Sequence, residues 1–222
     1  MSLLKIGFAK TLDIRLPCVA RYIDEKWVDE FLGDGKLRLS SFRRCAKHED
    51  EQRHDAREGR MSLQAEAPDG STLSAVTLPT PTLYILCCST AIDCMHRDLF
   101  NVSSGFVIDD PFAFAAAITD ALANCVACAQ GPCVYQAEMT RNKTLAEPLF
   151  TEDPKSEEEI ESKIGGAIRQ LDKLESMFTK PTSFSNQHEY RFVWAMENDV
   201  KETIDIVSPR AAKVCHKIQF KP

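Results

Sequence analysis

The sequence predicts an α+β fold, with mostly antiparallel strands and about three inserted helices, in a single domain over residues 1–222. Short alternating or apolar runs typical of strands outnumber the segments with helical periodicity. The order of these runs does not follow the regular strand–helix alternation of a doubly wound fold. The sequence also contains no internal repeat, low-complexity tract or linker that would divide it.

The first elements are a strand, a helix and a second strand. Residues 12–23 alternate between apolar and polar side chains and predict a strand. Asp24 can then cap a helix over residues 25–32, whose apolar positions share one face and which ends at two glycines. Residues 36–42 alternate cleanly and predict the next strand.

The rest of the chain is rich in strand signals. Residues 68–71, Pro-Asp-Gly-Ser, indicate a hairpin turn between two of these strands. The predicted strands are residues 61–67, 72–78, 82–89, 105–108, 133–139, 188–196, 202–207 and 213–220. Residues 142–155 read as a loop.

Two longer helices interrupt these strands. The first starts at Asp110-Pro111, an N-cap followed by proline at the first helical position. Its buried stripe extends to Cys125, and Gly131 closes it. The second covers residues 156–178, where a capping box opens a helix with one packed stripe and an acidic, solvated outer face.

Composition places the chain among ordinary globular proteins. It has 222 residues, of which 44% are hydrophobic and 27% charged, so a full core can form without disulfides or metal. The net charge of −6 does not favour a nucleic-acid binder, although phosphate binding depends on a local basic face rather than on the total.

The chain shows no sequence signal for export or for membrane insertion. The N-terminus lacks the apolar core and cleavage site of a signal peptide, and no apolar run reaches the roughly 20 residues that span a bilayer. Nine cysteines, an odd number, then favour reduced thiols. We therefore expect a cytoplasmic protein that does not engage a membrane.

The strand over residues 188–196 carries the first candidate site. Alternation along a strand places Gln187, Glu189 and Arg191 on one side. On an exposed face these side chains would form an ordinary Glu–Arg pair worth little. Facing a cleft, Glu189 could instead stabilise a developing cation or orient a hydroxyl group.

Two further groups of residues are candidates. Segment 43–60 is almost wholly polar and contains Arg53, Asp55 and Glu58. Such a loop is usually just solvated, but polar loops held on a rigid sheet are also where function concentrates. The other group, Tyr22 with Ser40-Ser41, lies at predicted strand ends, where these residue types are most often structural.

Metal binding is not predicted. Cys125 and Cys128, with Cys133 following, have the spacing of one half of a zinc site, but a second pair is missing, so helix packing is the favoured interpretation. The sequence also has no HExxH motif, glycine-rich phosphate loop or GxSxG elbow, which argues against zinc hydrolases, nucleotide kinases and α/β-hydrolases.

Taken together, these pieces resemble ADP-ribosyltransferases. The matching segments are Arg21-Tyr22, the helix over residues 25–32, Leu39-Ser40-Ser41 and Gln187-His188-Glu189. The chain is also similar to a bacterial family of uncharacterised and abortive-infection proteins. That family has a Glu-Tyr-Arg-type strand near the C-terminus and an Arg-x-Asp-x-x-Glu-Gly-like segment after the second strand. The first resemblance implies split β-sheets that hold NAD, as a substrate, in a central cleft.

The resemblance also implies roles for individual residues. Glu189 would be the catalytic carboxylate, because cleavage of the nicotinamide–ribose bond passes through an oxocarbenium-like state. Gln187 would position the acceptor, and Arg53 would suit the pyrophosphate, since a guanidinium binds phosphate oxygens bidentately. The NAD-binding residues implied in this way are Arg21, Tyr22, Ser40, Ser41, Arg53, Asp55 and Glu58.

The implied function is that of a toxin-like or phage-defence effector. It would modify a protein or nucleic acid, and in a toxin–antitoxin system it would have an antitoxin or another partner protein. Two alternatives stay open: a non-catalytic sensor or interaction protein on the same scaffold, and a nuclease whose Asp55 and Glu58 hold a divalent metal. The enzyme hypothesis requires Glu189, Tyr22 and Arg53 to face a shared cleft.

Overall fold

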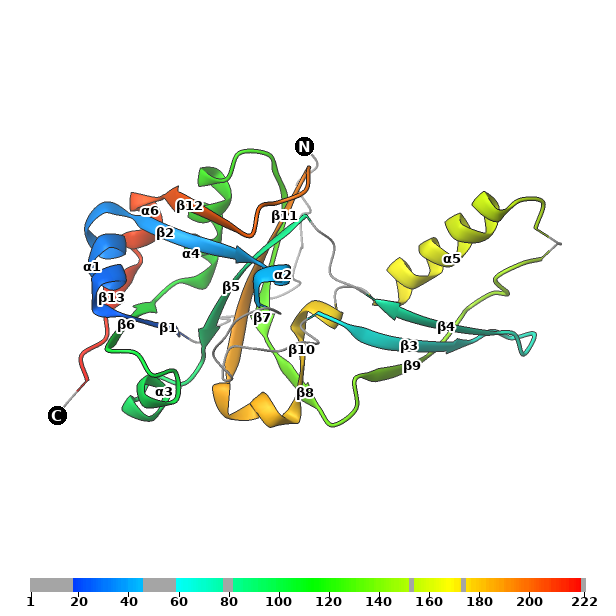
Figure 1. Cartoon of the computed structure of the whole chain (residues 1–222), viewed down its shortest axis with the longest axis horizontal. Coiled ribbons are helices and arrows are strands. Elements are labelled where there is room, and N and C mark those ends of the chain that lie inside the picture. The colour runs from blue at the N-terminus through cyan, green and yellow to red at the C-terminus, as the bar shows by residue number, and fades with distance from the viewer. Residues whose placement is uncertain (1–17, 46–58, 78–81, 152–153, 173–174, 221–222) are drawn as a thin grey trace, which may run out of the picture.

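The structure, a computed structural model, describes residues 18–45, 59–77, 82–151, 154–172 and 175–220 (Figure 1). It confirms the predicted α+β class with mostly antiparallel sheets. The helices are α1 (Glu25–Asp34), α2 (Phe42–Cys45), α3 (Cys94–Leu99), α4 (Pro111–Ala121), α5 (Glu157–Asp172) and α6 (Pro209–Ala212), with 3₁₀ turns η1 (Glu175–Phe178) and η2 (Thr182–Gln187). Of these, α1, α4 and α5 are the long ones. The single-domain assignment stays a prediction.

An eight-stranded antiparallel sheet forms the larger part of the structure. Its strands are β1 (Val19–Ile23), β2 (Lys36–Ser41), β5 (Leu83–Ser89), β6 (Ser104–Ile108), β7 (Cys125–Pro132), β11 (Glu189–Met196), β12 (Thr203–Val207) and β13 (Cys215–Lys217). One edge of β5 pairs with β11 along its whole length, and β7 follows β11.

The sheet forks at the other edge of β5. The first part of β5 pairs with β2, through Ile85 and Ser40, and its last residue, Ser89, pairs with Ala20 of β1. One arm continues from β2 to β12, and the other runs from β1 to β6 and β13. Helix α1 connects β1 to β2, so two strands that are close in sequence diverge along a single central strand. We call the space between β1 and β2 the fork.

Two smaller sheets complete the described part of the chain. The first consists of β3 (Met61–Glu66), β4 (Thr72–Thr77) and β9 (Thr140–Thr144), and the second of β8 (Val134–Gln136) and β10 (Thr179–Pro181). The hairpin predicted around residues 68–71 is confirmed, since β3 and β4 are antiparallel neighbours. Figure 1 shows the three-stranded sheet and α5 extending to one side of the large sheet.

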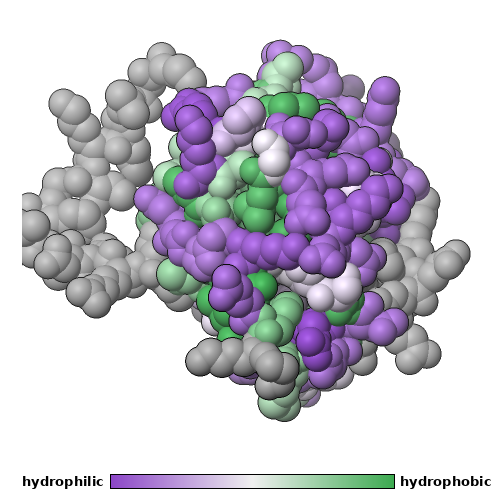
Figure 2. Space-filling model, turned by 90° about the vertical axis from the view of Figure 1, so that its left-hand side faces the viewer, coloured by the Kyte–Doolittle hydropathy of each residue, from purple (hydrophilic) through white to green (hydrophobic). Residues whose placement is uncertain are grey.

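The main core lies between the large sheet and helices α1 and α4. Aromatic rings carry much of it: Phe31 of α1 lies 4.6 Å from Phe106, and Phe114 of α4 lies 5.1 Å from Phe192, measured between ring centroids. These side chains are 0% exposed, and burying one such ring contributes about 1.5–3 kcal/mol. The outer face that includes α1 is mostly hydrophilic, with a hydrophobic strip near its centre (Figure 2).

Local sequence signals set the end of α1 and the start of α4 as expected, whereas Asp24, the predicted cap of α1, makes no side-chain capping hydrogen bond. The Asp110 carboxylate accepts a hydrogen bond from the Ala113 amide at 3.0 Å, which caps α4. Gly35 ends α1 with a φ of 74°, and a Cβ atom there would lie 2.5 Å from the Pro209 nitrogen. Glycine is therefore required at this position by both backbone conformation and space.

Two predicted helices are too long. The first ends at Ala121 rather than near Gly131, because the chain turns at Asn124, with a φ of 62°, and enters β7, which pairs with β11. The helix predicted over residues 156–178 ends at Asp172, and η1 and β10 follow. Pairing with a neighbouring strand outweighed helical periodicity in both places.

Most predicted strands are confirmed with small shifts at their ends, although residues 12–17 of the first predicted strand lie outside the described residues. The clearest departures are shorter strands near residues 133–139 and 213–220, which are reduced to β8 and β13. The loop predicted over residues 142–155 contains the end of β9. Strand ends are the part of such a prediction least determined by local pattern.

Candidate functional site

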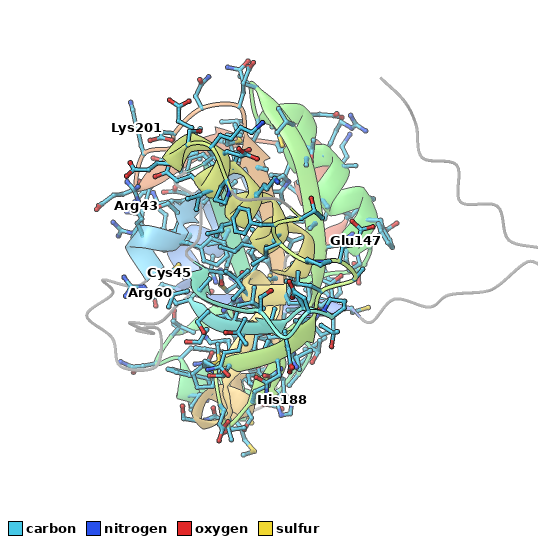
Figure 3. All side chains as sticks on the ribbon, turned by 90° about the vertical axis from the view of Figure 1, so that its right-hand side faces the viewer. Arg43, Cys45, Arg60, Glu147, His188 and Lys201 are labelled. Atoms are coloured by element: carbon cyan, nitrogen blue, oxygen red, sulfur yellow. The ribbon has the colours of Figure 1, made fainter. Side chains whose placement is uncertain are left out.

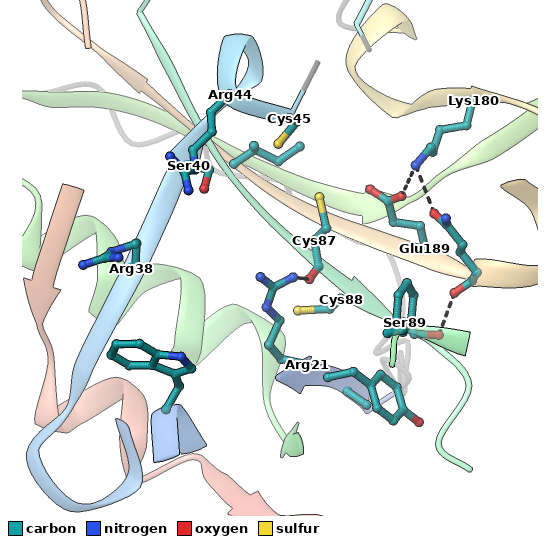
Figure 4. Close-up of a pocket in the computed structure, with 16 residues that line it drawn as sticks. Arg21, Arg38, Ser40, Arg44, Cys45, Cys87, Cys88, Ser89, Lys180 and Glu189 are labelled. Atoms are coloured by element: carbon teal, nitrogen blue, oxygen red, sulfur yellow. Dashed lines mark hydrogen bonds and ion pairs between the residues drawn. The ribbon is translucent and has the colours of Figure 1, made fainter. Parts of the chain in front are cut away.

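A cavity of about 350 Å³ occupies the fork of the large sheet (Figure 4). Residues from β1, β2, β5, α1, α2 and the start of β11 line it. Its volume is within the usual range for small-molecule sites. Glu189 lies toward one end, and Arg38 and Arg44 lie toward the other (Figure 4). The cavity therefore has an acidic end and a basic end.

Glu189 belongs to a network of four buried side chains. The Glu189 carboxylate accepts from Arg191 Nε at 2.5 Å and from Lys180 Nζ at 2.7 Å. Lys180 also donates to Gln187 Oε1 at 3.0 Å. Each of the four is 5% exposed or less. We call Lys180, Gln187, Glu189 and Arg191 the buried charge network.

The network keeps Glu189 ionised. Burial by itself would raise the pKa of the carboxyl group, but the charges of Arg191 and Lys180 outweigh this effect and lower the pKa to about 2. A carboxylate can accept about four hydrogen bonds, of which these two cations use one each. The remaining acceptor positions can receive a hydroxyl group of a ligand in the cavity.

Gln187 and Glu189 come together by a different route from the predicted one. Gln187 ends the 3₁₀ turn η2 instead of preceding Glu189 in an extended strand, and His188 has a left-handed backbone with a φ of 45°. The prediction of simple alternation over these three residues is therefore wrong. Their side chains nevertheless converge, because both hydrogen-bond to Lys180.

The interpretation of Glu189 and Arg191 as an exposed surface pair is also wrong. The exposed fraction of the Arg191 side chain is 0%, and that of Glu189 is 5%. Arg191 also donates to the Met177 carbonyl and lies 5.9 Å from the Phe42 ring centroid. It therefore supports Glu189 from the interior, while Glu189 lines the cavity.

Three arginines line the cavity. Arg21 donates to the Cys87 carbonyl, Arg38 forms a two-point pair with Asp205 at 2.6 and 2.8 Å, and Arg44 is exposed at the end of α2. The Arg38 guanidinium lies 5.9 Å from the ring of Trp27, a half-exposed side chain that also lines the cavity. This end of the cavity suits phosphate groups and a planar ring.

Tyr22 lines the cavity with its ring, but its hydroxyl group has a structural role. The hydroxyl donates to the Ala91 carbonyl at 3.0 Å and accepts from the Asp93 amide at 2.9 Å. Burial raises the pKa of Tyr22. The hydroxyl thus fixes the turn after β5, and the ring packs beside His96 and Phe100.

The two predicted serines separate. Ser40 lines the cavity, whereas Ser41 does not, because neighbouring strand residues point to opposite faces. Ser41 is buried, and its hydroxyl accepts from the Arg44 amide at 3.4 Å. Ser41 is therefore not part of the described cavity lining, and its observed contact is with α2.

The third predicted group cannot be placed. Arg53, Asp55 and Glu58 lie outside the described residues. Of the three side chains that the enzyme hypothesis requires in one cleft, Glu189 and Tyr22 line the same cavity. The carboxylates of the nuclease hypothesis, Asp55 and Glu58, have no described position.

The cysteines do not form the predicted arrangement. Cys125 and Cys128 lie on the strand β7 and not on a helix, so helix packing is not the reason for their spacing. Among the described residues, no group of three or more His, Cys, Asp or Glu side chains could hold a metal ion.

Sequence reasoning missed several residues of the site. Lys180 comes from the strand β10, Arg44 from α2 and Trp27 from α1, and each lines the cavity. Lys180 lies just after the helix predicted over residues 156–178, and no sequence pattern placed it near Glu189. Trp27 was assigned to the buried face of α1, but it is 45% exposed.

Comparisons with known proteins do not assign the chain to a family. No family model matches it, and searches of curated proteins and of solved structures found no match. Among the described helices, none combines the length and apolar character needed to cross a membrane.

Proposed function

We propose that this protein binds NAD in the fork and transfers ADP-ribose to a protein or nucleic acid, as a toxin-like or phage-defence effector. One observation carries the proposal: an ionised, buried carboxylate stands at one end of a cavity whose other charged lining groups, among the described residues, are cations. Such a cavity can bind a dianionic pyrophosphate and still direct one negative charge at a reacting ribose.

The basic end supports binding of the dinucleotide. Arg44 is exposed and lines the cavity, so its guanidinium can take phosphate oxygens bidentately. In the proposal it takes the role that we predicted for Arg53. Trp27 offers an aromatic face against which a nucleobase can stack.

The acidic end supports the chemistry. When the bond between nicotinamide and ribose C1′ breaks, its electron pair leaves with nicotinamide and the ribose becomes positively charged. Glu189, ionised at neutral pH, would stabilise that charge by preorganised electrostatics. A nucleophilic atom of the acceptor then bonds to C1′ and releases its proton to water. Gln187 lines the same end of the cavity, where it would orient the acceptor.

A specific observation favours a second candidate, a sensor that binds the nucleotide without cleaving it. Both oxygens of Glu189 already contact a cation, which weakens the field that the carboxylate exerts on a ligand. A binding protein needs the charged cavity but not that field. Both candidates place the ligand in the fork cavity. Only the transferase cleaves NAD, and only there would Glu189 affect the rate of cleavage.

The first experiment measures binding, by isothermal titration of the full chain with NAD. We expect Arg44→Ala to weaken binding about tenfold, as loss of a charge-assisted hydrogen bond would. Arg43→Ala is the matched control: this neighbour is also an exposed arginine of α2, but it does not line the cavity and lies at the outer edge of the molecule in Figure 3. Absence of binding by the native protein would refute both candidates.

The second experiment measures turnover with labelled NAD and whole-cell lysate. We expect the native protein to release nicotinamide and label an acceptor, and Glu189→Gln to be slower by a factor on the order of 10². Thermal unfolding and NAD titration of the variant distinguish lost catalysis from lost folding. Binding without release of nicotinamide would overturn the transferase and support the sensor.

A further inference from the structure

Two cysteines meet at the wall of the fork cavity. Cys45 is the last residue of α2, and Cys87 lies in β5. Both line the cavity, and both pack against the same small hydrophobic cluster, which includes Phe42 and Ile85. In Figure 4 both sulfur atoms face the same part of the cavity. The two residues are distant in sequence but adjacent in space.

The sheet explains why they meet. β2 and β5 are paired neighbours, with Ser41 opposite Tyr84, and α2 starts directly after β2. The short helix therefore turns back over β5 and brings its last residue toward Cys87. The Cys45 side chain has the largest effect on the raised pKa of the Cys87 thiol, so the two thiols are close neighbours. A disulfide requires the sulfur atoms to approach to about 2 Å, which a shift of the short helix α2 can provide.

The surroundings of the two thiols differ. The hydrogen bond with Cys45 is the main cause that raises the pKa of the Cys87 thiol, and burial and the Glu189 charge raise it further. Cys87 therefore stays protonated at neutral pH. Cys45 ends α2 beside the exposed Arg44 and is itself partly exposed, so an oxidant in the cavity can reach its sulfur.

We propose that Cys45 and Cys87 are an oxidisable pair, which a peroxide converts into a disulfide across the wall of the cavity. The peroxide transfers one oxygen to the Cys45 thiol, which becomes a sulfenic acid, and the peroxide is itself reduced to one water. The Cys87 sulfur then attacks the Cys45 sulfur, and the hydroxyl group leaves with the Cys87 proton as a second water. Two thiols and one peroxide thus yield one disulfide and two waters.

The disulfide alters the cavity in two ways. It fixes the end of α2 and with it Arg44, the neighbour of Cys45 that lines the basic end. It also ties down the residue whose carbonyl accepts the Arg21 hydrogen bond. Formation of the disulfide rests on these contacts alone, whereas its effect on NAD binding rests also on the proposed function.

The test exposes the full reduced chain to hydrogen peroxide, blocks remaining thiols with N-ethylmaleimide and maps disulfides by mass spectrometry. We expect a peptide that links Cys45 to Cys87 and disappears after dithiothreitol treatment. Cys45→Ser removes this link, whereas Cys128→Ser, at an exposed cysteine of β7 that does not line the fork cavity, leaves it unchanged. Oxidation that links other pairs, or that stops at single cysteines, overturns the proposal.

A second probe tests whether the two thiols are neighbours without using an oxidant. Phenylarsine oxide binds two neighbouring thiols at once, so the native protein should bind it and Cys45→Ser should not. Equal binding by both overturns the proposal. NAD titration of the oxidised protein should then show affinity at least about tenfold lower than that of the reduced protein. If the reduced protein binds no NAD, the proposed function fails, while the mapped disulfide still decides the redox proposal.

Discussion

Two arginine–carboxylate pairs in this protein have nearly the same closest distance and opposite surroundings. Arg191 approaches Glu189 to 2.5 Å and Arg38 approaches Asp205 to 2.6 Å, in both cases through Nε. The side chains of the first pair are 0% and 5% exposed, and those of the second are 54% and 68% exposed. Distance alone therefore does not distinguish them, and burial does.

The contrast shows where the protein maintains an energetically costly arrangement. An exposed pair gains little, because water and salt screen both charges. A buried pair must first lose its hydration, so it stabilises the fold only when every charge has its partners. The buried charge network meets that condition through Lys180 and Gln187. Such an arrangement beside a cavity is what a binding or catalytic site requires, which supports the proposed function.

The largest expected effect comes from breaking the buried pair. Arg191→Met should lower the free energy of unfolding by about 3–5 kcal/mol, because it leaves the Glu189 carboxylate with one cation and removes the donor to the Met177 carbonyl. Urea unfolding followed by tryptophan fluorescence measures the change. A loss below about 1 kcal/mol would mean that the buried pair stabilises the protein no more than an exposed surface pair does.

A smaller effect should follow from titrating Glu189. Its pKa of about 2 in the folded protein is below the ordinary value of 4.5, so the unfolded chain binds the proton more tightly. The stabilisation is fully present above pH 4.5 and is lost as the pH falls toward 2. It should amount to something on the order of 3 kcal/mol. Urea unfolding between pH 2 and 7 should show this slope, and Glu189→Gln should flatten it relative to the native protein.

The smallest effect should come from the exposed pair. Arg38→Met should change the free energy of unfolding by less than about 1 kcal/mol, since both side chains are largely solvated. The same urea titration, repeated at high salt, should show the native protein approaching the variant. A loss as large as that of Arg191→Met would mean that burial is not what separates the two pairs.

The sequence predicted the fold class and most strands because their signals are local. Alternation identified β2 and the β3–β4 hairpin, and Asp110-Pro111 marked the start of α4. Helix ends were harder to predict, since Cys125, the last residue of the predicted apolar stripe, belongs to β7, which pairs with β11. Pairing between distant segments has no local signature in a single sequence.

Only part of the candidate site was predicted, because several of its contacts join segments that are distant in sequence. Glu189, Gln187, Arg21, Tyr22 and Ser40 all line the fork cavity, and Ser41 points away from it. The sequence did not decide whether Glu189 is buried, because alternation shows which side chains share a face but not whether that face is exposed to solvent. Only the structure shows that Lys180 is a partner of Glu189, because the two residues meet where β10 contacts the start of β11.

The fork also leaves part of β5 without a second neighbour. Between its pairings at Ile85 and at Ser89, no described strand lies along the edge that faces β1 and β2. The Cys87 carbonyl on this stretch is satisfied by the guanidinium of Arg21 instead of by an amide. A ligand in the fork can therefore contact the main chain where a continuous sheet would have another strand. Recognition of that kind depends on peptide groups, which side-chain substitution leaves in place.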